Sequence, residues 1–248
     1  MGSYVPTTAA EREQMLAAVG VSSLEALYQD VPQQMLLPKD GLKLPAGLSE
    51  LEVQQKVSAL AEKDHVFQTV LRGAGAYRHF IPAVVRSVTS REELVTCYTP
   101  YQAEISQGAL QGIFEFQTMM CELTGMDVSN ASHYDGATAA AETIPMCKDR
   151  KRTVVFVSAA AHPQVIQVMQ TYCFASNTEL KLIPMKDGRT DLEALQASLG
   201  ADAAMFYLQQ PNYLGQVEDA KAIGELVHAA GAKFVMGVNP IACALLPI

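Results

Sequence analysis

The sequence predicts an α/β protein: a large domain with a mostly parallel sheet and flanking helices, preceded by a helical N-terminal arm. The first observation is a set of short apolar runs typical of buried strands: Thr153–Val157, Glu179–Ile183, Ala203–Leu208 and Lys233–Val238. The second is that helical patterns alternate with these strands: Gln164–Phe174, Asp191–Leu199 and Glu218–Ala230. A strand and helix repeating roughly every 25 to 30 residues indicates right-handed βαβ crossovers. We expect the arm to cover residues 1–65 and the domain residues 66–248.

The arm has two clear helix starts and no strand pattern of the parallel type. Thr8–Glu11 and Ser49–Glu52 each place a Ser or Thr three residues before a Glu, which is the capping-box spacing. The first helix is expected to end at Gly20 and the second at about Lys63. This front third either wraps over the surface of a partner or covers the core of its own chain.

Composition and charge exclude several classes of function. The chain has 248 residues, of which 49% are hydrophobic, so it can bury a sizeable core. Its net charge is −8 and its 18 basic residues are scattered, so no binding of nucleic acid is expected. The apolar runs are far shorter than the roughly 20 residues of a membrane span, and the N-terminus has no basic segment leading into an apolar core. We therefore expect a cytoplasmic protein without membrane contact.

The metal-ligating residue types do not cluster in the sequence. None of the five cysteines forms a CxxC pair with another, and the five histidines show no HxxxH or HxH spacing. We expect no metal site and reduced thiols.

The segment Tyr98–Gln107, which we call the ledge, is the first candidate site. Pro100 lies between Tyr98 and Tyr101, and a residue before proline is biased toward extended conformations, so a stiff, non-helical segment is expected. Ser106 is expected to cap the helix that follows, which ends at Gly125. An apolar stripe predicts that this helix is buried: Leu110, Ile113, Phe114, Met120 and Leu123. The alternative is an ordinary loop whose tyrosines are half-buried and whose Gln102 and Glu104 cap nearby backbone groups.

The second candidate site lies where the predicted strands end, because ligands of open α/β sheets bind outside the carboxyl ends of the strands. The residues there are Ser158–His162, Gln209–Asn212 and Asn239. Asp135 opens a turn that leads into a helix, whose first amides could hold an anion. Asp135 is equally well explained as a helix cap, and His162, which precedes a proline, as a structural residue.

Four blocks of sequence together resemble one family. They are Tyr98–Gly108 (YTPYQAEISQG), Phe114–Ser132, Tyr134–Ala139 (YDGATA) and Gln209–Gly215 (QQPNYLG). They are similar to glycine decarboxylase, the P protein of the glycine cleavage system, and most similar to subunit 1 of its two-subunit form. The resemblance runs over essentially the whole chain.

The resemblance implies a pyridoxal-phosphate fold of type I and an enzyme. The implied activity is that of a glycine dehydrogenase (aminomethyl-transferring), an oxidoreductase acting on CH–NH2 with a disulfide acceptor. Together with subunit 2, which carries the Schiff-base lysine and most cofactor contacts, the chain would decarboxylate glycine. The aminomethyl group would pass to the lipoyl arm of the H protein, and the implied assembly is an α2β2 heterotetramer.

The resemblance also implies roles for particular residues. Tyr98 and Tyr101 would be catalytic, with Thr99, Gln102 and Glu104 binding substrate. His162 could stack on the cofactor ring, and Asp135 would lie near the cofactor. A carboxylate at the end of such a strand normally keeps the pyridine nitrogen protonated, and Asn239 has no charge with which to do so.

No lysine follows the strand that ends near Val238. The chain is therefore expected to be truncated within the large domain. Two alternatives stay open: an independent aminotransferase- or desulfurase-like enzyme truncated before its lysine, and a non-catalytic scaffolding subunit that positions its partner.

Overall fold

The computed structural model describes residues 6–38, 41–71, 73 and 79–246. The chain divides into two compact units, Met1–Val70 and Leu71–Ile248. The first unit is the helical arm, and the second contains the sheet, the ledge and both candidate sites.

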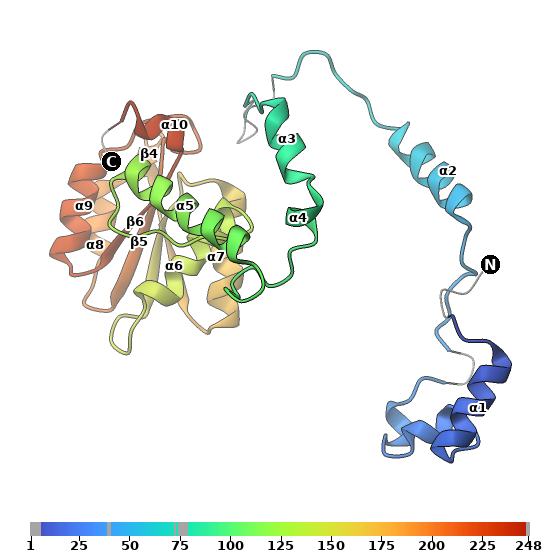
Figure 1. Ribbon diagram of the computed structural model, residues 1–248. Helices are drawn as coiled ribbons and strands as arrows, with labels where there is room; N and C mark the ends of the chain where they lie inside the picture. The colour runs from blue at the N-terminus through green and yellow to red at the C-terminus, as the bar shows by residue number, and fades with distance from the viewer. Residues whose placement is uncertain (1–5, 39–40, 72, 74–78, 247–248) are drawn as a thin grey trace. The chain divides into compact units, whose positions relative to one another are not determined.

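The arm contains the two helices that the capping boxes predict (Figure 1). Helix α1 spans Ala9–Val19 and α2 spans Glu50–Ala61. In each capping box the Glu carboxylate accepts a hydrogen bond from the N–H of the capping residue, and the Ser or Thr oxygen accepts one from the Glu N–H. Short 3-10 turns, η1 (Glu25–Tyr28) and η2 (Gln33–Met35), lie between the helices. No residue in any of the four elements is buried.

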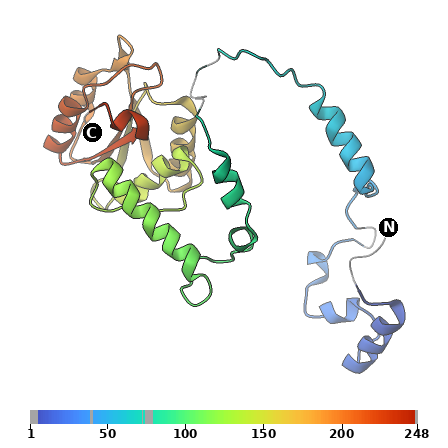
Figure 2. The same cartoon turned by 45° about the horizontal axis from the view of Figure 1, so that its top comes forward.

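The second unit is built on a parallel sheet, as predicted (Figures 1 and 2). Its strands run in the order β2-β1-β5-β6 and every neighbouring pair is parallel. The strands are β1 (Val154–Ser158), β2 (Glu179–Ile183), β5 (Ala203–Gln210) and β6 (Lys233–Val238). The structure adds a two-stranded antiparallel hairpin of β3 (Met185–Lys186) and β4 (Arg189–Thr190), which is too short to leave a pattern in the sequence.

Helices cover both faces of this sheet (Figure 1). They are α6 (Gly136–Cys147), α7 (Pro163–Ala175), α8 (Leu192–Ser198) and α9 (Ala220–Ala229). Side chains of a strand point alternately to its two faces, so Val155 and Val157 join the core with α6 and α7. Phe156, between them, joins the core with α8 and α9. The central strands β1 and β5 are therefore buried on both sides, as their continuous apolar runs predict, whereas β2 and β6 at the edges are partly exposed.

The remaining elements are α3 (Ala83–Thr89), α4 (Glu92–Val95), α5 (Gln107–Thr124) and α10 (Pro240–Cys243). The prediction that α5 is buried is wrong, since none of its residues is buried. Leu110, Ile113 and Met120 are half-buried, whereas Phe114 and Leu123 are more than half exposed. The physical reason is that α5 lies outside the helical layers of the sheet and contacts α10, which covers only one side of it.

Candidate functional site

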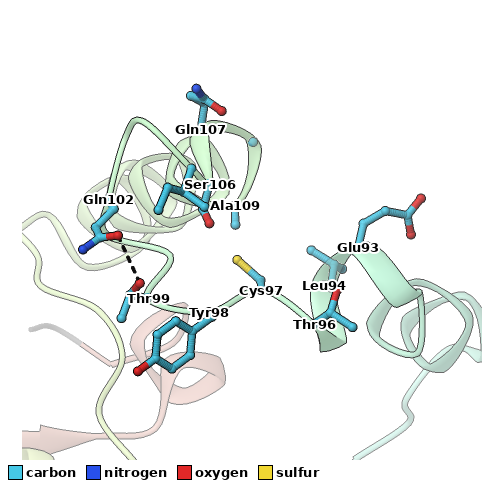
Figure 3. A pocket seen from close by; sticks show the side chains of 12 residues that line it. Glu93, Leu94, Thr96, Cys97, Tyr98, Thr99, Gln102, Ser106, Gln107 and Ala109 are labelled. Atoms are coloured by element: carbon cyan, nitrogen blue, oxygen red, sulfur yellow. Dashed lines mark hydrogen bonds between the residues drawn. The ribbon is translucent and has the colours of Figure 1, made fainter. Parts of the chain in front are cut away.

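The ledge forms one wall of a cleft of about 820 Å³ between α4 and the start of α5 (Figure 3). Tyr98, Thr99 and Gln102 line this cleft, and Cys97 points its thiol into it. Tyr101 and Glu104 are exposed residues of the ledge that do not line the cleft. The structure thus brings together three of the five ledge residues that the sequence predicts as site residues.

The ledge is a turn and not an extended segment. Thr99 has a φ of 46°, so the predicted extended conformation is wrong. The Gln102 N–H donates to the Thr99 carbonyl oxygen at 3.1 Å, which closes a turn with Pro100 at its second position. The Thr99 hydroxyl also donates to Gln102 Oε1 at 3.3 Å (Figure 3). Proline fixes its own φ at the value this turn position requires, and the closed turn outweighs the extended bias of Thr99.

Both tyrosine side chains of the ledge are displayed to solvent. Tyr98 is 83% exposed and Tyr101 is 61% exposed, so neither ring is half-buried against the core as the loop interpretation requires. Neither hydroxyl makes a hydrogen bond with any residue that the structure describes. Ser106 occupies the N-cap position of α5, but its side chain makes no capping bond, contrary to the prediction. The ledge therefore presents two free phenol groups from a closed turn.

A second cavity, of about 850 Å³, lies at the carboxyl ends of β1, β5 and β6. We call it the strand-end cavity. It brings together His162, Gln209 and Asn239, as expected from the parallel topology. Strand β5 runs through Gln210, so Gln209 is the penultimate strand residue and not the first loop residue. Its Oε1 accepts a hydrogen bond from the His162 backbone N–H at 2.7 Å, which ties the end of β5 to the start of α7.

His162 is held in place by its neighbours. Its Nδ1 accepts a hydrogen bond from the Gln164 N–H at 3.1 Å and so caps α7. Its ring meets the Tyr213 ring edge-on at a centroid distance of 4.9 Å. Because Nδ1 is the acceptor in this cap, the ring N–H lies on Nε2.

Asp135 acts as a cap of α6. Its Oδ1 accepts a hydrogen bond from the Thr138 N–H at 2.8 Å, and the Thr138 hydroxyl lies 3.0 Å from the same oxygen. The Thr138 amide lowers the pKa of the Asp135 carboxyl. The carboxylate does not line the strand-end cavity, whereas the next two residues, Gly136 and Ala137, do.

Tyr207 is a residue of the cavity that sequence reasoning missed. It is 4% exposed and lines the cavity from β5, two residues before Gln209 and on the same face. Burial raises the pKa of its phenol to about 12. Its ring lies against Gly237 of β6, where a built Cβ would come 2.9 Å from Tyr207 Cζ and would collide with the hydroxyl. The sequence does show a tyrosine, an aromatic residue with a polar tip, within an otherwise apolar strand. Only the register of β5 and β6 shows which glycine makes room for it.

The side-chain oxygen of Asn239 is used to cap the helix that follows it. Its Oδ1 accepts hydrogen bonds from the N–H groups of Ile241, at 2.9 Å, and Ala242, at 3.4 Å, and so caps α10. The amide group that is left for the cavity is the Nδ2 donor. Among the residues that the structure describes, the cavity lining includes no lysine.

The fold defines a doubly wound α/β domain with a cavity at the strand ends, the edge at which such domains bind ligands. The family model described as glycine cleavage system P-protein matches residues 2–247. A protein named "Probable glycine dehydrogenase (decarboxylating) subunit 1" from Moorella thermoacetica is 47% identical over 98% of this chain and 55% of its own length. The protein of the same name from Geobacillus kaustophilus is also 47% identical, with the same coverage. The chain belongs to the glycine cleavage system P-protein family.

The solved structures agree with this. A crystal structure of glycine decarboxylase (P-protein) of the glycine cleavage system, in inhibitor-bound form, matches 99% of this chain and 55% of its own chain. Its TM-score is 0.81 and its sequence identity is 38%. A sphingosine-1-phosphate lyase from Burkholderia pseudomallei, with 12% identity and a TM-score of 0.54, shares the fold alone. The chain spans about half the length, 55%, of the curated relatives it matches.

Two further properties concern only the part of the chain that the structure describes. None of its helices is both long and apolar enough to cross a membrane. Nor do its histidine, cysteine, aspartate and glutamate side chains form a group that could hold a metal ion.

Proposed function

We propose that this chain is subunit 1 of a glycine dehydrogenase (decarboxylating) and works with a second, lysine-bearing subunit. The observation that carries the proposal is the match to relatives of that name along 98% of the chain. These relatives favour it over an aminotransferase- or desulfurase-like enzyme. With the second subunit, the chain decarboxylates glycine and transfers the aminomethyl group to the lipoyl arm of an H protein, as an α2β2 assembly in the cytoplasm.

The cofactor of the assembly, pyridoxal phosphate, belongs mainly to the partner in this proposal. None of the described residues that line the strand-end cavity is a lysine, so these residues supply no amine to which the cofactor could attach. Asn239 offers a donor where a protonated pyridine nitrogen, itself a donor, requires an acceptor. In this proposal the partner makes the main contacts with the cofactor, and His162 and Asp135 make only secondary ones.

The ledge is the part of this chain that meets the substrate. The Tyr98 and Tyr101 hydroxyls are free donors on exposed rings, and they hydrogen-bond and orient the carboxylate of glycine. The turn between Thr99 and Gln102 fixes the direction in which these rings leave the backbone. Glu104, exposed on the ledge two residues after this turn, faces the amino end of the substrate, since opposite charges attract.

The test is reconstitution of the complex. The chain is mixed with a lysine-bearing second subunit and a lipoylated H protein, and glycine-dependent exchange of labelled bicarbonate is measured. We expect exchange only when both subunits are present. Exchange by the second subunit that is undiminished when this chain is omitted would refute the proposal.

A further inference from the structure

The serine, threonine, amide and carboxylate side chains that are buried in the described part of the chain all belong to one hydrogen-bonded network. They are Ser158, Thr190, Gln210, Asn212 and Glu218. Their buried nitrogen and oxygen atoms all have hydrogen-bond partners among the described residues. The network lies where the end of β1, strand β4 and the loop after β5 meet, and it contains a glutamate that the proposed function does not use.

Glu218 places a carboxylate within this network. The side chain is 5% exposed, and neither oxygen forms an ion pair with a basic side chain of the described residues. Neutral donors meet the carboxylate instead: the Thr190 N–H donates to Oε1 and Oε2, at 3.2 and 3.1 Å, and Asn212 Nδ2 donates to Oε1 at 2.9 Å. Burying a charge costs free energy that such donors offset, so this carboxylate indicates a fixed arrangement of donors more than added stability.

Asn212 connects Glu218 to the loop after β5. Its Nδ2 donates to Glu218 and also to the Gly188 carbonyl oxygen, at 2.8 Å. Its Oδ1 accepts hydrogen bonds from the N–H groups of Leu214 and Gln216, both at 3.0 Å. Because both ends of the amide are in use, Asn212 cannot turn over without losing these bonds. The course of the loop is therefore tied to Glu218.

A second route leads from Glu218 to the same loop through β4 and β1. Thr190, whose N–H donates to Glu218, has its hydroxyl oxygen 2.8 Å from the Ser158 hydroxyl oxygen. The Ser158 oxygen accepts a hydrogen bond from the Ala160 N–H at 3.1 Å, and the Ala160 carbonyl oxygen accepts one from the Tyr213 N–H at 2.8 Å. The two routes close a ring that joins the loop after β5 to the turn before α7.

His162 lies directly beside this ring of hydrogen bonds. It follows Ala160 by two residues in the turn before α7, and its imidazole meets the Tyr213 ring edge-on at a centroid distance of 4.9 Å. Tyr213 is only partly buried, so its place beside the imidazole depends on the backbone that carries it. That backbone is the loop that Glu218 and Asn212 hold.

We propose that Glu218 is a positioning residue, which acts through Asn212 and Tyr213 to hold the His162 imidazole in one orientation. Both carboxylate oxygens are required as acceptors. In Glu218→Gln one of them becomes an NH2 group, which faces a donor in either orientation of the amide: the Thr190 N–H or Asn212 Nδ2. The loop must then shift, and the Tyr213 ring shifts with it. This inference goes beyond the proposed function, because it concerns this chain alone and needs neither the second subunit nor the cofactor.

Nuclear magnetic resonance of the full 248-residue chain with isotope-labelled histidine tests the proposal. His162→Gln assigns the His162 ring signals, and Tyr213→Leu shows where these signals lie when the neighbouring ring is lost. In Glu218→Gln we expect the His162 signals to move toward their positions in Tyr213→Leu. We also expect the nuclear Overhauser effect between the two rings to be lost.

Two controls separate positioning from a general loss of stability. Glu225→Gln makes the same chemical change at an exposed carboxylate of α9 and should leave the His162 signals in place. Val227→Ala removes buried volume near the far end of α9 from Glu218. It should lower the midpoint of urea unfolding without moving the His162 signals.

A second substitution at the same position serves if Glu218→Gln does not fold. Glu218→Asp keeps the charge but is one methylene shorter and cannot reach both donors, so it should move the same signals. Circular dichroism shows which variants are folded. Unmoved His162 signals in the folded variants of Glu218 would overturn the proposal. An equal movement in Val227→Ala would also overturn it, because any loss of stability would then disturb this ring.

Discussion

Removal of a single hydroxyl from the ledge separates a catalytic role from a structural one. Tyr98→Phe and Tyr101→Phe each delete one oxygen from a ring that is more than half exposed. Neither hydroxyl bonds a residue that the structure describes, so the fold loses no interaction. Exposed substitutions of this kind change the free energy of unfolding by less than about 0.5 kcal/mol.

The expected effect on activity is much larger. A hydrogen bond to a charged group such as the glycine carboxylate contributes about 1.5–3 kcal/mol. Losing it in the transition state lowers the rate by roughly 10- to 150-fold, at about 1.4 kcal/mol per factor of ten. We therefore expect each variant to lose between one and two orders of magnitude in exchange rate while the complex assembles normally.

The assay is glycine-dependent bicarbonate exchange in the reconstituted complex, with assembly followed by analytical ultracentrifugation. Tyr28→Phe in the arm is the control, because Tyr28 is also more than half exposed but lies outside the ledge. Full exchange rates in both ledge variants, with any effect of alanine substitution confined to assembly, would refute the reasoning. That result would favour a scaffolding subunit.

Three other results are expected from the structure. Gly237→Ala should lower the free energy of unfolding by about 1–3 kcal/mol, because the added methyl group overpacks against Tyr207. Gly112→Ala, on open helix surface, is the control and should not lower it. Equal midpoints of urea unfolding for the two variants would contradict this prediction. Because burial raises the pKa of Tyr207 to about 12, the unfolded chain loses this proton first, so stability should fall as the pH rises from about 10 toward 12, by on the order of 2 kcal/mol. In Tyr207→Phe, the free energy of unfolding measured with urea should fall less steeply over this pH range. An unchanged fall in the variant would mean that other titrating groups cause it. Amides of α1 and α2, which have no buried residue, should exchange hydrogen more slowly in the complex, and equal rates in the free chain would mean that the arm meets no partner.

The sheet could be predicted because its central strands, β1 and β5, are buried on both faces. A strand such as β1, with all five residues buried, leaves a continuous apolar run, and the helices between strands leave a different period. The helix starts could be predicted because a capping box depends on two residues three positions apart. These features are local, so they are visible without tertiary contacts.

The predictions that are wrong depend on tertiary contacts, which a sequence pattern does not show. The apolar stripe of α5 predicts a buried helix, but the periodicity does not say whether anything covers the stripe, and Phe114 is left exposed. A residue before proline is biased toward extended conformations, but the hydrogen bond that closes the turn determines the conformation of Thr99. The pairing of Tyr207 with Gly237 depends on strand register, which single-sequence patterns do not contain.

In the proposed assembly, the lysine that binds the cofactor lies on another subunit while this chain supplies the ledge. Borohydride reduction of the reconstituted complex with pyridoxal phosphate, followed by peptide mapping with mass spectrometry, tests this directly. The account predicts a pyridoxyl group on a lysine of the second subunit, and no reducible chromophore when this chain is treated alone. A pyridoxyl group attached stoichiometrically to a lysine of this chain would contradict it.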